Sequence, residues 1–136
     1  MEKVLVDTNI IIDLLTKRRE FYKPASQLFS MSDYNEIELA ISSLTFANTY
    51  YLLSKELRSE KAKEILRKFK LLVKVLPMDD KIIDLSLNSD FKDFEDAIQY
   101  YTAIENKLDL IVTRNLKDFK LSKLPVMTAG DYLKIK

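Results

Sequence analysis

The chain has 136 residues, 47% of them hydrophobic, which is enough for one domain with one sizeable core. It contains no cysteine and no histidine, so disulfides, thiolate zinc sites and every catalytic triad that uses imidazole are excluded. The 22 basic and 21 acidic residues nearly cancel, so a nucleic acid would have to meet local basic patches. Any catalysis must use carboxylates, Lys, Tyr, Ser/Thr or a hard metal ion.

Hydropathy argues against a membrane protein. No apolar run approaches the roughly 20 residues that span a bilayer, and the N-terminal apolar stretch is interrupted by Asp7 and Asp13. The lack of cysteine and of a recognisable secretory signal favours a reducing compartment. We therefore expect one cytoplasmic domain over residues 1–136, with no membrane partner.

The first half of the chain alternates short apolar runs with helical periodicity. Residues 3–6 predict a strand, followed by the polar tripeptide Asp7-Thr8-Asn9 and then a helix. Residues 21–34 predict a helix and residues 36–41 a second strand. Ser42 and Ser43 are cap candidates for a helix reaching toward residue 57, and Ser59 opens another helix through residue 72.

The second half continues the alternation. Residues 73–76 predict a strand, Asp79-Asp80 begins one helix, and Asp93 begins another that runs to about residue 106. Residues 108–112 predict a buried strand, 113–119 a polar loop or short helical turn, 125–127 a final strand, and Thr128 caps a last helix. Helices between strands imply an α/β three-layer sandwich, with a short, mostly parallel twisted sheet flanked by helices.

Polar segments follow three of the predicted strands. Asp7, Ser42-Ser43 and Thr113-Arg114-Asn115 all come directly after apolar runs, and parallel strands would bring them to one edge of the sheet. A simpler interpretation of Asp7-Thr8-Asn9 is a helix cap, because all three residue types are common in that position.

The helix that opens at Asp93 carries further acids. Asp93 and Asp96 are three residues apart and lie on one helical face, whereas Glu95 is expected to point elsewhere. Acidic residues in a first turn also favour the helix dipole, which is the simpler interpretation. If instead these carboxylates converge with Asp7, hard oxygen ligands of this kind select Mg²⁺ or Mn²⁺ and suit phosphoryl chemistry.

Four motifs together resemble the PIN-domain family. They are Val4-Leu5-Val6-Asp7-Thr8-Asn9, Ser42-Ser43-Leu44-Thr45, Asp96-Ala97 and Val112-Thr113-Arg114-Asn115-Leu116-Lys117-Asp118-Phe119. The resemblance spans the chain and implies a PIN-like fold and a Mg²⁺- or Mn²⁺-dependent endoribonuclease acting on single-stranded RNA, as in VapC-like toxins of toxin–antitoxin pairs. It also implies a homodimer and a small antitoxin protein as partners.

The resemblance assigns roles residue by residue. Asp7 and Asp96 match the family's acidic metal ligands, and Asp93 is a further candidate ligand. The remaining assignments are supporting residues Thr8, Asn9 and Thr113, the RNA-binding residue Arg114, and the catalytic positions Asn48, Asn115 and Asp118.

Two of these positions depart from the family pattern. Asn48 and Asn115 stand where relatives usually carry acids, so Asp118 or Asp93 would have to supply the missing charge. An amide keeps an oxygen donor but loses the negative charge, which should weaken metal binding.

Two alternatives remain open at this point. The amide substitutions favour a PIN-like RNA- or protein-binding module whose metal site is degenerate and inactive. A receiver-like regulator that accepts a phosphoryl group on Asp7 is the other alternative, although Thr113-Arg114-Asn115 offers no strand-end lysine for such a pocket.

Overall fold

A computed structural model describes all residues from Met1 to Lys136. Its five strands are β1 (Glu2–Val6), β2 (Ile37–Ser42), β3 (Lys74–Leu76), β4 (Leu110–Val112) and β5 (Val126–Met127). Its helices are α1 (Thr8–Leu15), α2 (Tyr22–Asp33), α3 (Ser43–Ser54), α4 (Ser59–Phe69), α5 (Asp80–Leu87), α6 (Phe94–Glu105) and α7 (Ala129–Lys134), with 3-10 turns η1 (Lys70–Leu72) and η2 (Leu116–Phe119).

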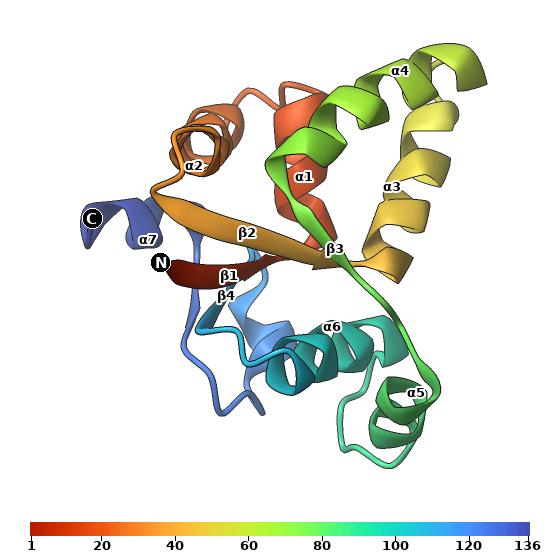
Figure 1. The fold of residues 1–136 in the computed structure, drawn as a ribbon, viewed down its shortest axis with the longest axis vertical. Coiled ribbons are helices and arrows are strands. Elements are labelled where there is room, and N and C mark those ends of the chain that lie inside the picture. The colour runs from red at the N-terminus through yellow and green to blue at the C-terminus, as the bar shows by residue number, and fades with distance from the viewer.

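The strands form one sheet in the order β3-β2-β1-β4-β5, and every neighbouring pair is parallel. Helices cover both faces: α1, α2, α3 and α4 lie on one side, and α5 and α6 on the other (Figure 1). The predicted three-layer α/β architecture is therefore confirmed. The order differs from the 2-1-3-4-5 order of receiver-like sheets, so the receiver-like alternative is wrong.

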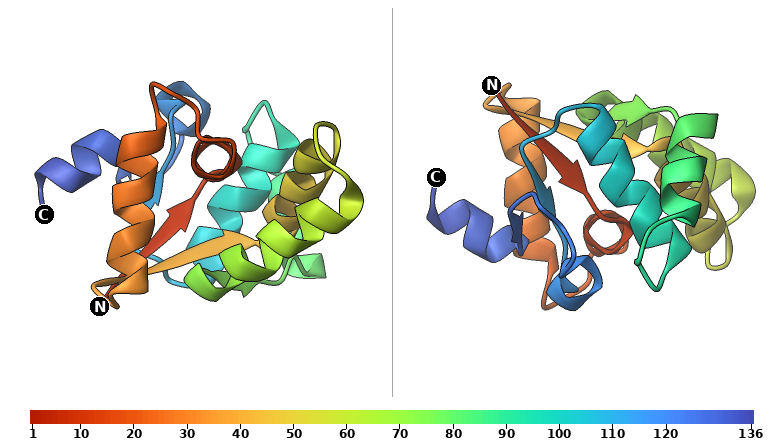
Figure 2. Two further views of the ribbon diagram at one scale, coloured as in Figure 1. Left: turned by 90° about the horizontal axis from the view of Figure 1, so that it is seen from above. Right: turned by 90° about the horizontal axis from the view of Figure 1, so that it is seen from below.

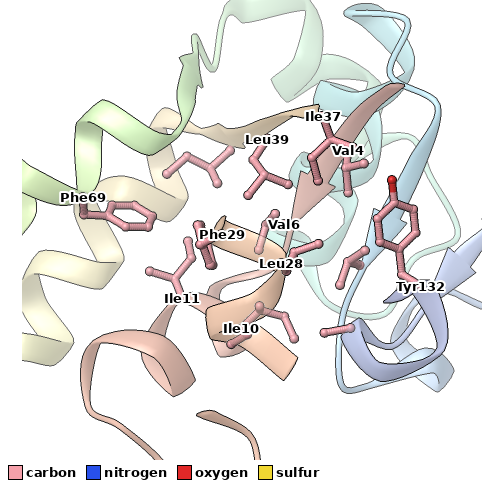
Figure 3. Close-up of a cluster of buried hydrophobic side chains, with 14 of the residues drawn as sticks. Val4, Val6, Ile10, Ile11, Leu28, Phe29, Ile37, Leu39, Phe69 and Tyr132 are labelled. Carbon is pink, nitrogen blue, oxygen red and sulfur yellow. The ribbon is translucent and has the colours of Figure 1, made fainter. Parts of the chain in front are cut away.

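The central strand explains why its sequence is apolar without interruption. Val4, Leu5 and Val6 are completely buried, because β1 is covered on both faces. Side chains alternate along a strand, so Val4 and Val6 enter the larger core while Leu5 enters the smaller one. The larger core also receives Ile11 from α1 and Phe29 from α2 (Figure 3).

The smaller core lies under α6 and η2. It contains Tyr100 and Ala103 from α6, Ile111 from β4 and Phe119 from η2. Through this packing, α6 is fixed beside the middle of the sheet. The first turn of α6 then comes close to the carboxyl ends of the strands.

Most helices begin at side-chain caps that the sequence predicts. Asp7, Ser42, Asp79, Asp93 and Thr128 each accept a hydrogen bond from a backbone N–H in the first turn of the following helix. These caps satisfy N–H groups that have no partner within the helix. The bonded N–H belongs to the first helical residue after Asp7 and to the third after the other four.

The predicted boundaries differ from the structure at a few ends. The helix expected to reach residue 72 ends at Phe69 and continues as the 3-10 turn η1. The strand expected from residue 108 begins at Leu110, because Lys107 has φ 55° and the N–H of Leu108 still donates to the α6 carbonyl of Ala103. None of the seven α-helices combines the length and the apolar composition that a membrane span requires.

Candidate functional site

Asp7 lies at the carboxyl end of the central strand. Its backbone N–H donates to the carbonyl of Val112 at 3.0 Å, so the β1–β4 pairing continues up to this residue. The side chain caps α1 and is only 6% exposed. Figure 2 shows the arrow of β1 pointing into the start of α1, with α6 alongside. The strand and the cap together fix the carboxylate at the edge where we expected a site.

Four donors hold the Asp7 carboxylate. Oδ1 accepts from the backbone N–H of Thr8 at 2.7 Å and from Nε2 of Gln99 at 3.0 Å. Oδ2 accepts from Oγ1 of Thr113 at 2.7 Å and from Nδ2 of Asn9 at 3.3 Å. Burial raises the pKa of Asp7, while the hydrogen bonds from Thr113, Gln99 and Thr8 act in the opposite direction. The structure thus places the three predicted supporting residues around Asp7.

Gln99 is the member of this network that the sequence analysis missed. It is 1% exposed, and its Oε1 accepts a hydrogen bond from Oγ1 of Thr45 at 3.5 Å. Gln99 therefore connects Asp7 to the first turn of α3. Its spacing could have identified it as a site residue, because Gln99 lies three residues after Asp96 and so shares that face of α6.

Asp96 lies in the first turn of α6 and is half-buried. Its pKa is raised to about 7, chiefly by burial and in addition by the nearby carboxylates of Asp93, Asp7, Asp118 and Glu95. Four carboxylates therefore oppose the ionisation of Asp96 at this edge of the sheet. Repulsion of this kind is relieved when a cation lies among the carboxylates.

Asp93 and Glu95 make different contacts at the start of α6. Oδ1 of Asp93 accepts the backbone N–H of Asp96 at 3.0 Å, so this carboxylate serves as the cap of α6. Glu95 does not point away from the site, because its Oε1 accepts from Oγ1 of Thr8 at 3.5 Å. The expectation that Glu95 points elsewhere is wrong. The cause is that α1 begins within reach of the first turn of α6.

The segment after β4 supplies Asn115 and Asp118, both of which are exposed. The backbone N–H of Asn115 donates to Oγ1 of Thr113 at 3.0 Å, which ties this segment to the Asp7 network. Asp118 lies on η2 and lines a cavity of about 340 Å³ together with Asp93 and Asp96. The same cavity is lined by Lys92, Lys117 and Lys120.

Asn48 lies on α3 and is half-buried. It follows Thr45 by three residues, and Thr45 is the residue that contacts Gln99. No hydrogen bond joins Asn48 to Asp7 or Asp96. Arg114 donates its backbone N–H to Oδ1 of Asn9 at 3.3 Å, so it also lies at the edge of the Asp7 network.

The side chains at this edge offer only oxygen donors suited to a hard cation, chiefly the carboxylates of Asp7, Asp96 and Asp118. The four hydrogen bonds to Asp7 match the about four acceptor positions of a carboxylate, so an ion at Asp7 would have to replace one of them, and the longest is the 3.3 Å bond from Asn9. No three acidic side chains are close enough to form a metal-binding group by themselves. The set fits a divalent ion that keeps several water ligands, as Mg²⁺ usually does. Fold and site therefore define a parallel α/β protein with an acidic site at the carboxyl edge of its sheet.

Comparison with known proteins identifies the family. A family model described as PIN domain matches residues 3–117, and this chain belongs to the PIN-domain family. Ribonuclease VapC1 of Aquifex aeolicus (strain VF5) is 31% identical, over 96% of this chain and 93% of that protein. The resemblance drawn from the sequence motifs is confirmed.

Solved structures show the same fold. A toxin–antitoxin complex from Klebsiella pneumoniae contains a chain that is 28% identical, with a TM-score of 0.68, covering 93% of this chain and 97% of that one. The DNA-bound VapBC of Salmonella typhimurium has a chain with a TM-score of 0.73 at 19% identity, covering 95% and 99%. Both alignments extend over nearly the whole domain.

Proposed function

We propose that this protein is an endoribonuclease that hydrolyses single-stranded RNA with the help of Mg²⁺ or Mn²⁺. The observation that carries the proposal is the buried Asp7 carboxylate, held by four donors and close enough to Asp96 to raise the pKa of that second carboxyl group. The relative named Ribonuclease VapC1 supports the choice of RNA as the substrate.

Asp7 and Asp96 would hold the ion, and Asp118 would add charge from η2. When bound, a divalent ion supplies activation of water and neutralisation of the charge that develops on the phosphodiester. Thr113, Gln99 and the Thr8 N–H keep the Asp7 carboxylate in one orientation, so the Asp7 side chain itself needs no rotation before binding. The hydrogen bond from the Asp96 N–H to Asp93 stabilises the first turn of α6, and this cap thereby positions Asp96.

We further propose that the protein is the toxin of a toxin–antitoxin pair and acts in the cytoplasm as a homodimer. Several solved relatives are VapBC assemblies, including those of Salmonella typhimurium and of nontypeable Haemophilus influenzae, which supports a small antitoxin protein as the partner. Co-expression with the product of a neighbouring small gene, followed by co-purification, tests this partner.

A second candidate function rests on Asn48 and Asn115, which replace carboxylates with amides. With fewer charges the site could bind RNA or a protein without cleaving, as a degenerate PIN module. The two candidates differ in metal binding, because a working site needs the ion and a degenerate site does not.

Cleavage of a single-stranded RNA across a Mn²⁺ titration separates the candidates. For a working nuclease, wild type should cleave at millimolar Mn²⁺ and Asp96→Asn should be inactive, while thermal unfolding confirms that both are folded. Asn48→Glu should lower the Mn²⁺ concentration required, because it adds a carboxylate. Equal cleavage by wild type and Asp96→Asn would overturn the proposal. Activity in Asn48→Glu alone would favour the degenerate module.

A further inference from the structure

Asp13 is a buried charge that the proposed nuclease mechanism does not use. It lies on α1 and is completely buried, and burial raises its pKa. Neither of its carboxylate oxygens accepts a hydrogen bond. A buried carboxylate is costly unless a cation compensates it, so Asp13 requires a cationic partner.

That partner is Arg114, whose Nε lies 2.8 Å from Oδ2 of Asp13. The N–H is not aligned for a hydrogen bond, so the contact is an ion pair. On another side, the guanidinium carbon lies 4.3 Å from the centre of the Phe21 ring. The guanidinium is therefore held by a buried carboxylate and an aromatic face at once.

The terminal nitrogens of Arg114 remain free. They make no hydrogen bond within the chain, and only Nε is sealed from solvent without a hydrogen-bond partner. The side chain is 26% exposed. Arg114 thus keeps unused N–H donors, in the fork geometry that matches two oxygens of a phosphate.

A cavity of about 340 Å³ lies beside this arginine. Arg114 and Asp13 line it together with Phe21, Asn115, Thr128 and Gly130. A Cβ added to Gly130 would meet no atom within 4 Å, so the space there is open. Arg114 and Asn115 supply donors around a volume that a phosphate group could enter.

A short chain of hydrogen bonds links the lining of this cavity to Asp7. Arg114 follows Thr113 directly, and its backbone N–H donates to Asn9, whose amide in turn donates to Asp7. The cavity is therefore close to the proposed cleavage site but does not include Asp7 or Asp96.

We infer that Asp13 and Phe21 hold Arg114 as a phosphate-binding arm, and that the cavity beside it receives an RNA phosphate next to the scissile bond. The inference rests on the proposed nuclease function. Asp13 is then a positioning residue, since it acts through Arg114. An ion pair that only joined α1 to the segment after β4 would not require an arginine with free guanidinium nitrogens in the lining of a cavity.

RNA binding in EDTA tests the arm without cleavage, with a fluorescent single-stranded oligonucleotide as the probe. For single strands, each phosphate contact contributes about 0.7 to the slope of log affinity against log salt. Arg114→Gln should reduce the slope by about 0.7 and weaken binding roughly tenfold. Lys68→Gln removes one charge from the exposed face of α4 and serves as the matched control, with an unchanged slope.

Variants at Gly130 and Asp13 test the cavity and the positioning role. Gly130→Phe should fill the cavity and weaken binding about as much as Arg114→Gln, whereas Gly130→Ala should cost less because it adds one methyl group. Combining Gly130→Phe with Arg114→Gln should add no further loss. Asp13→Asn should weaken binding in the wild-type background but not beside Arg114→Gln. If Asp13 had a purely structural role, Asp13→Asn would weaken RNA binding equally in wild type and in Arg114→Gln.

Cleavage kinetics distinguish failure of this inference from failure of the nuclease proposal. Arg114→Gln and Gly130→Phe should raise KM more than they lower kcat, with thermal unfolding confirming that both variants fold. If wild type cleaves RNA and these variants match it in KM and salt slope, the phosphate arm is wrong and the nuclease stands. If wild type neither binds nor cleaves RNA, both proposals are wrong.

Discussion

At the scale of single residues, the charge of Asp7 is set by competing effects. Burial raises its pKa, and the hydrogen bonds from Thr113, Gln99 and Thr8 oppose that rise. Gln99 links two buried groups, because its amide donates to Asp7 and accepts from Thr45 while the side chain is almost completely buried. An amide satisfies both partners, whereas an apolar side chain would leave a buried acceptor unpaired.

Gln99→Leu should therefore destabilise the protein and weaken its metal site. The volume is similar, but Asp7 loses a buried donor, and an unsatisfied buried group costs about 1–3 kcal/mol. Urea denaturation measures the loss in stability and Mn²⁺ titration the loss in affinity. Asn88→Leu, which replaces an exposed amide on the end of α5, is the control. An unchanged unfolding midpoint in Gln99→Leu would show that the amide is not needed.

Asp96 makes stability depend on pH. Its pKa is about 7 in the folded protein against an ordinary value of 3.8, so the folded state binds the proton more tightly. The free energy of unfolding should fall as the pH rises between these two values, because the folded state must then carry an unfavourable charge. Asp96→Asn should be more stable than wild type at pH 8 and closely similar at pH 3.

Thermal unfolding in EDTA at both pH values checks this expectation. Mn²⁺ should reduce the difference at pH 8, because a bound ion stabilises the ionised carboxylate. Equal melting temperatures of the two proteins at pH 8 would contradict the raised pKa of Asp96.

At the scale of elements, side-chain caps place the helices that carry the site. Asp93 caps α6 and so determines where Asp96 and Gln99 project, while Asp7 caps α1 and serves the site directly. Asp79 caps α5, which packs on α6 but contributes no site residue. The caps of α5 and α6 thus make the same kind of hydrogen bond, but only the cap of α6 fixes a turn that carries a site residue.

Asp79→Ala should lower stability by about 1 kcal/mol, the typical cost of losing an N-cap. RNA cleavage should not change, because α5 lies outside the acidic edge. Asp93→Ala should cost a comparable amount and also reduce cleavage, because the first turn of α6 carries Asp96. Urea denaturation and initial rates measured on the same preparations compare the two. Full activity in Asp93→Ala would show that the cap does not position Asp96.

At the scale of the whole molecule, the surface supports the proposed homodimer. The C-terminal part of α3 and the turn after it expose Tyr51 at 64%, Leu52 at 42% and Leu57 at 36%. Neighbouring exposed apolar side chains of this kind often mark an interaction surface.

Light scattering should therefore give a dimer mass at high micromolar concentration. Tyr51→Glu should shift the mass toward the monomer, because a charge at this surface opposes burial in an interface. Leu87→Glu changes a 66% exposed side chain on α5 and is the control. A monomeric wild type would contradict the dimer, and a dimeric Tyr51→Glu would place the interface elsewhere.

The sequence by itself determined the succession of elements and the main acidic residues. Apolar runs predicted all five strands, cap residues predicted most helix starts, and the motifs singled out Asp7 and Asp96 as candidate metal ligands. These features depend on neighbours along the chain, where periodicity and backbone hydrogen bonding act directly.

Only the tertiary structure decided which distant residues meet. It showed that Gln99 supports Asp7, that Glu95 reaches Thr8, and that Asp13 holds Arg114 beside an open cavity. It also gave the strand order that excluded the receiver-like alternative. The physical reason is that these contacts join residues on separate elements, and their distances depend on how helices pack across the sheet rather than on local spacing.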